Sequence, residues 1–508
     1  MPTTWTDMTM TMTASQAAVL AVASVTFLAL LLQVNKHVDQ PYMDEIFHAP
    51  QTQQYCAGRF HEWDPKITTF PGLYLVGAAL SHVAALLSWN GQFFCSLPVL
   101  RSVNVLFSLG NVALLIRLRQ QLAPRDPNGL LHAVMIAVFP VNFFFAFLYY
   151  TDCGALFFVL LMYSQAESVN LLVYPSNRGS FIFSALSGAA AVVFRQTNII
   201  WVAFTAGVVI VRCLELSHGN YIYGYDRQNV CMIMTAVLKL FRRVLINFVM
   251  VVLRNLPSLL QLVWPFVVIV AAFVVFLIKN GGIVVGLYQR TTLILPDQAD
   301  SYLHLQATNL HEASFHAAQL LYLTFVLATG FSVSLFAPTY VQKFAAAIRN
   351  KSKSIGGVVW LVMVVVGVFG VIQWFSPVHK FMLADNRHYT FYIWRKFFRK
   401  HALAKFLPST LYMFFGWRCW IELRRNRSPL WALVYGIAVT LVLIPSPLVE
   451  PRYYLIPFVV FHLNTGKQSR LVLLATIFGS MLTNAATLYV FMYKPFVWGD
   501  GSIARFMW

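Results

Sequence analysis

The sequence predicts an all-α, polytopic membrane protein with about 12–14 transmembrane helices in a single domain over residues 1–508. Hydrophobic residues make up 58% of the chain and charged residues only 11%, whereas a soluble domain carries about 25% charged residues. The mean hydropathy is +0.65. Apolar runs of about 20 residues, long enough to cross a bilayer, also recur along the chain. Together these observations exclude a soluble enzyme, a disordered chain and a secreted disulfide scaffold.

The first apolar run covers about residues 14–34 and has no Lys or Arg before it, so we interpret it as a transmembrane helix rather than a cleaved signal. These runs are helices because a backbone in lipid must satisfy its own hydrogen bonds, and they lack the alternation of membrane-barrel strands. Further runs are expected to begin near Phe70, Pro98, Leu130, Asp152, Phe181, Ile199, Pro257, Phe315, Ile355, Ala404, Pro429, Tyr453 and Leu471.

The distribution of charge predicts which side of the membrane each loop faces. The chain has 37 Lys and Arg against 18 Asp and Glu, a net charge of +19, which fits loops facing anionic membrane lipids rather than nucleic acid. Three basic loops, residues 212–254, 338–354 and 421–428, are expected in the cytosol. The luminal parts are then residues 35–68, the region around Asp152, residues 195–198, 280–314, 376–402 and 446–452, and the C-terminal tail.

Two basic groups conflict with strict alternation. Three arginines near the end of the run that begins at Pro98 favour the cytosol, yet alternation places them in the lumen unless one of the segments near Phe70 and Pro98 does not span. These are Arg117, Arg119 and Arg125. The basic stretch at residues 395–400 lies in a loop expected to be luminal, and an amphipathic helix at the lipid headgroups would explain it.

The six cysteines show no CxxC or other metal-binding spacing. Cys56 and Cys95 could form a disulfide. The sequence also has no P-loop, no Rossmann glycine pattern, no HExxH and no DxD pair of the kind that holds a metal–nucleotide sugar. We therefore expect no metal and no cofactor. An enzyme of this kind would take an activated substrate from the membrane itself.

The densest polar segment, residues 41–48, directly follows the first apolar run and contains Asp44, Glu45 and His48. Two carboxylates beside a membrane suit proton abstraction, because partial desolvation raises their basicity. They suit cation binding equally well, and a solvated loop with Asp44 as a helix N-cap is the structural alternative. Nearby aromatic and polar side chains, among them Trp63 and Asp64, are of the kinds that bind sugars.

Further polar groups lie at the ends of other apolar runs. Cations and histidines in residues 379–390 could hold a lipid phosphate, although snorkelling side chains at a helix end would look the same. Glu450 and Arg452 could pair, either in a proline-stiffened turn or in a functional site. Asp152 begins a predicted helix, where an acid also favours the macrodipole. Arg195 is costly near lipid unless it is paired or interfacial, and both settings are compatible with phosphate binding.

These motifs, in this order, resemble the eukaryotic dolichyl-phosphate-glucose α-1,2-glucosyltransferases over nearly the whole chain. The segments that carry the resemblance are YMDEIFH (42–48), EWDPKITT (62–69), PGLY (71–74), YYTD (149–152), FRQTNIIW (194–201), NGGIVVG (280–286), HK (379–380), LADNRHYTFY (383–392), LVEPRYY (448–454) and RFMW (505–508). The chain departs from the family pattern after Gly286, where residues 287–310 form an atypical insert in a loop expected to be luminal.

The resemblance implies a GT-C fold in the endoplasmic reticulum membrane, with the active site facing the lumen. It implies transfer of the third, terminal glucose from dolichyl phosphate glucose to the diglucosylated high-mannose oligosaccharide on dolichyl diphosphate. This is the last step in assembling the lipid-linked oligosaccharide for protein N-glycosylation. Because the donor is a β-phosphate and the product is α-linked, a single inverting displacement is implied.

The resemblance also implies roles for individual residues. Asp44 in the first luminal loop, residues 35–68, would be the catalytic base, and Glu45 would orient the acceptor. The donor phosphate would be bound largely by the luminal loop at residues 376–402, and the candidates are His379, Lys380, Arg387, His388, Arg195 and Arg452. Sugar contacts would come from Trp63, Asp64, Asp152, His48, Asp385 and Asn386.

Two alternative functions stay open from the sequence. Another GT-C transferase that uses a dolichyl-phosphate sugar would share the fold and differ in its acceptor. A non-enzymatic transporter or channel-associated protein would also be polytopic, but it would place polar residues along a path at mid-helix depth. In this sequence the charged and His-rich motifs lie mainly at helix ends on one side, which favours catalysis at the membrane surface.

Overall fold

Helices form nearly all the regular structure of the chain. A computed structural model describes residues 12–87, 94–171, 178–223, 234–283, 314–331, 334–377, 385–446 and 448–508. Within these ranges the other regular structure is a short antiparallel hairpin near the C-terminus, β1 (Phe496–Val497) with β2 (Ile503–Ala504). The all-α prediction is confirmed. The predicted insert at residues 287–310 lies outside the described residues.

Within the described ranges, six helical segments are long and apolar enough to cross a membrane: α1 (Ala14–His37), α4 (Leu97–Leu122), Gln196–Tyr223, α11 (Leu256–Asn280), α16 (Ile355–Trp374) and α22 (Arg470–Tyr493). The third of these joins a 3-10 turn, Gln196–Asn198, to α9 (Ile199–Tyr223). Shorter apolar helices are α3 (Gly72–Leu87), Phe181–Phe194 within α8 (Arg178–Phe194), Val244–Arg254 within α10 (Met234–Arg254), α14 (Ala318–Thr329) and α20 (Pro429–Leu443).

The other helices are short or less apolar. They are α2 (Glu45–Cys56), α5 (Gly129–Ala137), α6 (Pro140–Phe145), α7 (Thr151–Ser168), α15 (Pro338–Ser352), α18 (Tyr389–Ile393), α19 (Ser409–Arg424) and α21 (Leu455–Leu463). Three irregular turns complete the set: Trp394–Phe398 is π-helical, and Ala404–Phe406 and Pro451–Tyr454 are 3-10 helices. The basic stretch expected as an amphipathic helix therefore falls partly in the π-helical turn.

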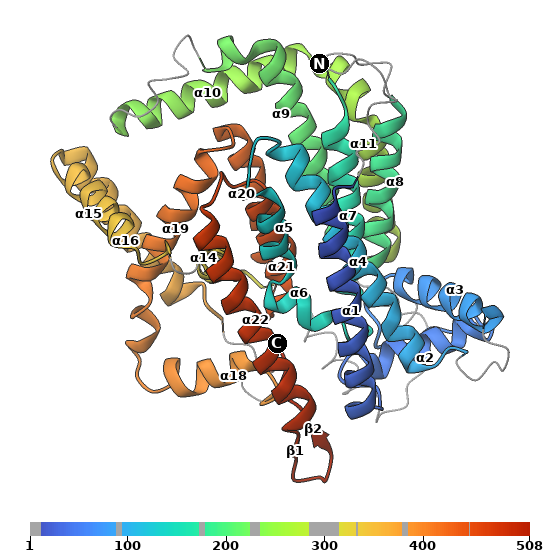
Figure 1. Ribbon diagram of the computed structural model, residues 1–508. Helices are drawn as coiled ribbons and strands as arrows, with labels where there is room; N and C mark the ends of the chain where they lie inside the picture. The colour runs from blue at the N-terminus through green and yellow to red at the C-terminus, as the bar shows by residue number, and fades with distance from the viewer. Residues whose placement is uncertain are drawn as a thin grey trace, which may run out of the picture.

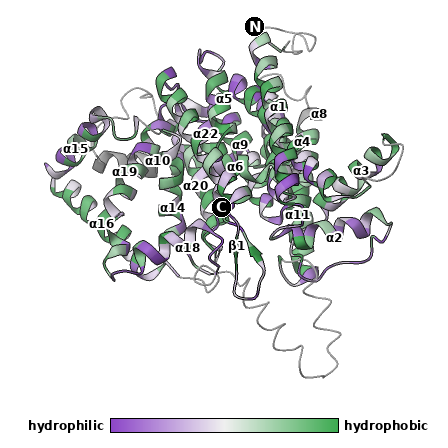
Figure 2. Cartoon of the chain, turned by 60° about the horizontal axis from the view of Figure 1, so that its bottom comes forward, coloured by the Kyte–Doolittle hydropathy of each residue, from purple (hydrophilic) through white to green (hydrophobic). Residues whose placement is uncertain are grey.

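Each apolar run expected from the sequence coincides with a helix, but several helices are shorter than the run. The run near Leu130 shows the reason. Helix α5 ends at Ala137, and Pro140 begins the separate helix α6, because proline is favoured in the first turn of a helix and disfavoured in its interior. The expected total of 12–14 thus includes short and broken helices. Figure 2 shows mainly hydrophobic colours on the helices of the bundle and hydrophilic stretches on α2 and near α18.

Helices α2 and α3 form a pair that lies beside one end of the bundle in Figure 1 instead of continuing along it. Helix α4 then runs antiparallel to α1, since Arg101 near its start donates to the carbonyl of Val38 at 2.6 Å. At the far end of α4, Arg119 donates to the carbonyl of Leu463 at 2.9 Å. Arg427 of the basic loop at residues 421–428 also contacts this end, through Asn464 at 2.7 Å. Because α3 lies beside the bundle end and not alongside α1 and α4, the charge conflict disappears when α3 is not counted as a spanning helix.

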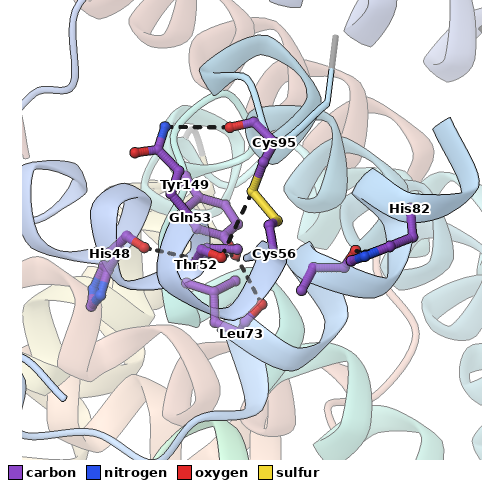
Figure 3. The surroundings of a disulfide bond; sticks show 9 residues. His48, Thr52, Gln53, Cys56, Leu73, His82, Cys95 and Tyr149 are labelled. Atoms are coloured by element: carbon purple, nitrogen blue, oxygen red, sulfur yellow. Dashed lines mark hydrogen bonds between the residues drawn. A yellow bond between two sulfur atoms is a disulfide. The ribbon is translucent and has the colours of Figure 1, made fainter. Parts of the chain in front are cut away.

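A disulfide fixes the α2–α3 pair to the start of α4. Cys56, the last residue of α2, is bonded to Cys95, and their Cα atoms are 6.4 Å apart. The disulfide considered from the sequence is confirmed. Figure 3 shows Thr52 and Gln53 of α2 beside it, and the Gln53 amide donates to the Cys95 carbonyl at 3.3 Å. The segment that follows Asp44 is therefore anchored covalently at its far end.

A fully buried ion pair fixes the beginning of α2. Glu45 and Arg101 have side chains with 0% exposure, and Arg101 donates to both carboxylate oxygens, at 2.9 Å and 2.6 Å. The same oxygens accept main-chain N–H groups from Tyr149 at 2.6 Å and Tyr42 at 3.1 Å. One carboxylate thus joins α4, the loop after α1 and the segment before α7. This loop also carries Asp44.

We expect the buried pair to be a large contributor to stability. Arg101→Met leaves the Glu45 charge buried without its partner, and should destabilise the protein by about 3–5 kcal/mol. Adding Glu45→Gln to that variant should recover part of the loss. Thermal unfolding of the purified protein in detergent measures both effects.

The exposed pair Arg59–Glu62, whose side chains are 48% and 44% exposed, supplies a matched control. Arg59→Met should cost less than about 1 kcal/mol, because water screens surface ion pairs. Equal losses for Arg59→Met and Arg101→Met would contradict the account.

Candidate active site

Asp44 lies in the turn between α1 and α2, and its carboxylate is partly open to solvent. The preceding residue, Met43, has a φ of 56°, a left-handed conformation that costs a non-glycine residue about 1–2 kcal/mol. Asp44 occupies the N-cap position of α2, but within the described structure its side chain makes no capping hydrogen bond. The side chain is 37% exposed and accepts a hydrogen bond from Arg452 Nη1 at 2.9 Å. Helix capping therefore does not explain Asp44.

Arg452 is the central cation of the site. It lies in the 3-10 turn before α21, and its Nε and Nη2 donate to Glu450 at 3.1 Å and 2.6 Å. The pairing of these two residues considered from the sequence is confirmed. The guanidinium also lies over the rings of Phe145 and Tyr150, with centroid distances of 5.5 Å and 5.2 Å. Glu450 and these rings hold the guanidinium in place, with Nη1 directed to Asp44.

A second ion pair adjoins the first. Asp152, in the first turn of α7, has a side chain only 3% exposed, and its carboxylate pairs with Arg195. Its other oxygen lies 3.6 Å from Arg452 Nη1. Helix α7 is buried along most of its length, so Asp152 lies within the bundle end rather than on its surface. Three carboxylates and two guanidinium groups therefore form one connected network.

A cavity of about 140 Å³ opens beside this network. Asp152, Arg195 and Arg452 contribute its charged lining, and Thr197 and Asn198 add uncharged polar groups. The rest of the lining is mainly apolar and comes from α9, α20 and α21, including Trp201, Val442, Leu455, Ile456 and Pro457. Cationic groups next to an apolar wall suit a ligand that combines a phosphate with a hydrocarbon chain.

Two effects act in opposite directions on the pKa of the Asp44 carboxyl. Burial raises the pKa of the Asp44 carboxyl, but the positive charges of Arg452 and Arg195 and the His48 ring outweigh it and bring the pKa below its usual range. Burial lowers the pKa of the His48 imidazole. Asp44 is therefore ionised at neutral pH. Desolvation acts on Asp44 in the expected direction, but nearby cations outweigh it, so the basicity of Asp44 is not raised in this structure.

A second group of predicted site residues, Asp385 to His388, lies at the same end of the bundle. The Asp385 carboxylate accepts from Arg387 Nε and Nη2, both at 2.8 Å, and lies 3.7 Å from His388 Nε2. The Arg387 charge interacts electrostatically with the hydroxyl groups of Tyr42 and Tyr150. Tyr150 in turn accepts a hydrogen bond from the Asp44 main-chain N–H at 3.1 Å. The acid loop and the cationic loop thus adjoin one another.

Other predicted residues lie around this centre. The His48 Nδ1 atom is 2.7 Å from the Tyr74 hydroxyl, and the Trp63 ring packs edge-on against Tyr74 with a centroid distance of 5.7 Å. Asp64 accepts from the main-chain N–H of Lys66 at 2.8 Å and so stabilises its own loop. The Asn386 amide oxygen accepts from the Trp498 indole at 2.9 Å. His379 and Lys380 lie outside the described residues.

Glu45 differs sharply from its neighbour Asp44. Both of its oxygens accept hydrogen bonds within the protein, and its side chain has no exposed surface. This geometry does not support the expected contact between Glu45 and an acceptor sugar. Its partner Arg101 was not predicted as a site residue, and neither were Tyr42 and Tyr150. Tyr42 stands in the YMDEIFH motif and Tyr150 in the YYTD motif, and these motifs were the signals available for them.

A metal site is not evident in the described part of the chain, where no three His, Cys, Asp or Glu side chains gather at a distance suited to an ion. What the site does offer is a partly exposed, ionised carboxylate beside guanidinium groups. Such an arrangement can accept a proton from a hydroxyl group and stabilise a departing phosphate.

Comparison with known proteins gives long matches. A relative from Mus musculus is 37% identical over 505 residues, covering 96% of this chain and 98% of the relative. One from Rattus norvegicus is 36% identical with the same coverage, and one from Arabidopsis thaliana is 32% identical, covering 97% of this chain and 99% of the relative. All three are named Dol-P-Glc:Glc(2)Man(9)GlcNAc(2)-PP-Dol alpha-1,2-glucosyltransferase.

Among solved structures, the archaeal oligosaccharyltransferase AglB from Archaeoglobus fulgidus aligns over 96% of this chain and 56% of that chain. The TM-score is 0.38 and the sequence identity 13%. The DIE2/ALG10 family profile matches residues 38–463, a range that contains Asp44, Asp152, Arg387 and Arg452. The match covers most of the chain, and the chain belongs to the DIE2/ALG10 family.

Proposed function

We propose that this protein transfers the terminal glucose from dolichyl phosphate glucose to the diglucosylated oligosaccharide on dolichyl diphosphate, forming an α-1,2 linkage. The names of the relatives support this assignment. The observation that carries it structurally is the contact between Asp44 and Arg452, which places a proton acceptor next to a phosphate-binding cation. This transfer is the last step of lipid-linked oligosaccharide assembly, and we expect a GT-C fold to perform it.

The reaction is a single inverting displacement. The 2-hydroxyl oxygen of the acceptor glucose attacks C1 of the donor glucose, and the bond between C1 and the phosphate oxygen breaks. Dolichyl phosphate leaves with the electron pair, and Asp44 takes the proton of the hydroxyl group. A base and a stabilised leaving group suffice for this displacement, so no protein nucleophile is needed, as in inverting glycosidases.

Arg452 couples the two halves of this reaction. Without substrate its Nη1 binds Asp44, while Glu450 holds the opposite edge of the guanidinium. A donor phosphate in the adjacent cavity would compete with Asp44 for Nη1. As negative charge develops on the leaving phosphate, Arg452 stabilises it, and Asp44 becomes a stronger base as the cation is drawn away.

Arg387 and His388 provide a second set of groups for the phosphate, and Arg195 supports the network through Asp152. His379 and Lys380 stay in this proposal as phosphate ligands on the sequence resemblance alone. Trp63, Asp64 and His48 brace the first loop, residues 35–68, which would face the sugars. Asn386 braces the loop before α18 through its hydrogen bond with Trp498. Glu45 is reassigned from acceptor binding to positioning, because its carboxylate is occupied by Arg101.

The site is proposed to face the lumen of the endoplasmic reticulum. The Cys56–Cys95 disulfide joins the last residue of α2 to the segment before α4, and Asp44 precedes the same short helix α2. Disulfides form in the oxidising lumen rather than the cytosol. Arg119 and Arg427 lie together at the opposite end, as the positive-inside rule requires for a cytosolic face. Both observations support the same orientation.

Asp44→Asn should abolish transfer, because an amide cannot accept the proton, and general-base loss typically costs about 10²–10⁴-fold in rate. The measurement is complementation of cells that lack the final glucosyltransferase, with analysis of the lipid-linked oligosaccharide for two or three glucoses. Glu62→Gln, in the same loop but exposed, is the matched control and should restore three glucoses. Normal turnover by Asp44→Asn would reject Asp44 as the base, and a differently linked product would indicate another transferase.

The pH dependence tests the role of Arg452. Activity requires ionised Asp44, so kcat/KM should fall as the pH drops through the pKa of Asp44, which Arg452 holds below its usual range. Arg452→Gln removes that charge, and the acid limb should move to higher pH. The rate should also fall by about 10²–10³-fold through lost phosphate stabilisation. An acid limb at the same pH in both proteins would contradict the coupling.

A further inference from the structure

The C-terminal segment, residues 494–508, lies across both loops of the proposed site. After α22 it forms the hairpin of β1 and β2, seen below α22 in Figure 1, and then returns towards the bundle. Its last residues contact the loop after α1 on one side and the loop before α18 on the other. These two loops are more than 300 residues apart in sequence and carry Asp44 and Arg387.

Arg505 attaches this segment to the acid loop. Its main-chain N–H donates to the Tyr42 hydroxyl at 2.6 Å, and that hydroxyl donates to the Arg505 carbonyl at 2.7 Å. The Arg505 guanidinium donates to the carbonyl of His37, the last residue of α1, at 2.8 Å and to the carbonyl of Phe491 in α22 at 2.9 Å. Tyr42 is two residues from Asp44, so this attachment lies directly beside the proposed base.

The residues around Arg505 attach the segment to the cationic loop. The Met507 N–H donates to the Arg387 carbonyl at 2.9 Å, and His388 Nδ1 lies 2.9 Å from the Trp508 main-chain oxygen. The Trp498 ring lies against the Arg387 guanidinium, with a centroid distance of 4.7 Å. Asp385 holds the same guanidinium through two hydrogen bonds. The Arg387 side chain is therefore fixed between a carboxylate and an indole.

We propose that residues 496–508 are a positioning element for the transfer reaction, holding the Arg387–His388 cations at a set place relative to the Asp44 loop. This inference rests on the proposed function. Among the described residues, the helix adjoining these cations is α18, which has only five residues. Misplacement of a reacting or charge-stabilising group by about 1 Å can cost about 10²-fold in rate, and contacts on both sides of the segment prevent such movement.

Three variants test the positioning role. Tyr42→Phe removes the hydroxyl that makes both bonds to Arg505 but keeps the ring, which packs edge-on against Phe491 with a centroid distance of 5.7 Å. Trp498→Leu removes the indole that lies against Arg387, and Trp498→Phe restores an aromatic face. We expect kcat to fall by about 10- to 100-fold in Tyr42→Phe and Trp498→Leu, with thermal stability nearly unchanged and substantial rescue by Trp498→Phe. Val497→Thr, at a side chain 67% exposed in the same hairpin, should keep the wild-type kcat.

A second measurement does not depend on activity. Hydrogen–deuterium exchange of the purified full-length variants should be faster in residues 385–392 for Trp498→Leu and in residues 38–44 for Tyr42→Phe, with unchanged exchange in α7. An unchanged kcat together with unchanged exchange in both loops would overturn the inference. Loss of kcat that follows a general loss of thermal stability would also overturn it, since the segment would then serve only folding. A wild-type protein that forms no triglucosylated product would instead reject the proposed function, and the exchange data would still decide whether the segment holds the loops.

Discussion

The buried contact between Glu45 and Arg101 determines where the neighbouring carboxylate of Asp44 lies. An ion pair without exposed surface is stable only when its hydrogen-bonding groups are satisfied, and here two main-chain N–H groups complete the coordination of Glu45. The loop after α1, the start of α4 and the segment before α7 are therefore held together. Asp44 is the next residue along the chain, and it is left facing Arg452. The two adjacent acids thus differ in role: Glu45 holds segments together inside the protein, and Asp44 faces Arg452 where solvent can reach it.

The same end of the bundle concentrates charge in a largely apolar protein. Ion pairs in such a setting are costly to bury, and the network of Asp44, Asp152, Glu450, Arg195 and Arg452 is stabilised by mutual pairing. Because Arg452 is shared among three carboxylates and Arg195 pairs with Asp152, a phosphate that enters the cavity meets cations whose positions are already fixed. Preorganised charge of this kind stabilises a leaving group without the cost of reorienting it.

Much of this architecture could be predicted from sequence, because it follows from local composition. Apolar runs such as the one near Ile355 gave helices, and the spacing of Glu450 and Arg452 indicated their pairing. The course of α3 could not be predicted, since its apolar composition is equally compatible with a spanning helix. One local feature indicated that α3 does not lie along the bundle: strict alternation of spanning helices would place the positive charge of Arg119 in the lumen. The position of α3 beside the bundle end explains why Arg119 need not lie there.

The site itself was only partly predictable. Polar residues could be found from the sequence, but their burial and partners depend on segments that are distant in the chain. Glu45 and Asp44 look equivalent in sequence, and only the approach of Arg101 from α4 distinguishes them. The contact between Tyr42 and Arg505 joins residues 463 positions apart, and the motifs in which they stand, YMDEIFH and RFMW, do not indicate that the two residues meet. Likewise, the lowered pKa of Asp44 reflects cations brought by two other segments, including Arg452, rather than the apolar surroundings alone.

In the proposed mechanism one guanidinium, that of Arg452, serves the base and the leaving group in turn. A structure of the wild-type protein with dolichyl phosphate bound tests this most directly. The expected result is that Arg452 lies within hydrogen-bonding distance of the phosphate, with the Asp44 carboxylate facing the space where the acceptor hydroxyl would lie. A phosphate bound away from Arg452, with the Asp44–Arg452 contact intact, would contradict it.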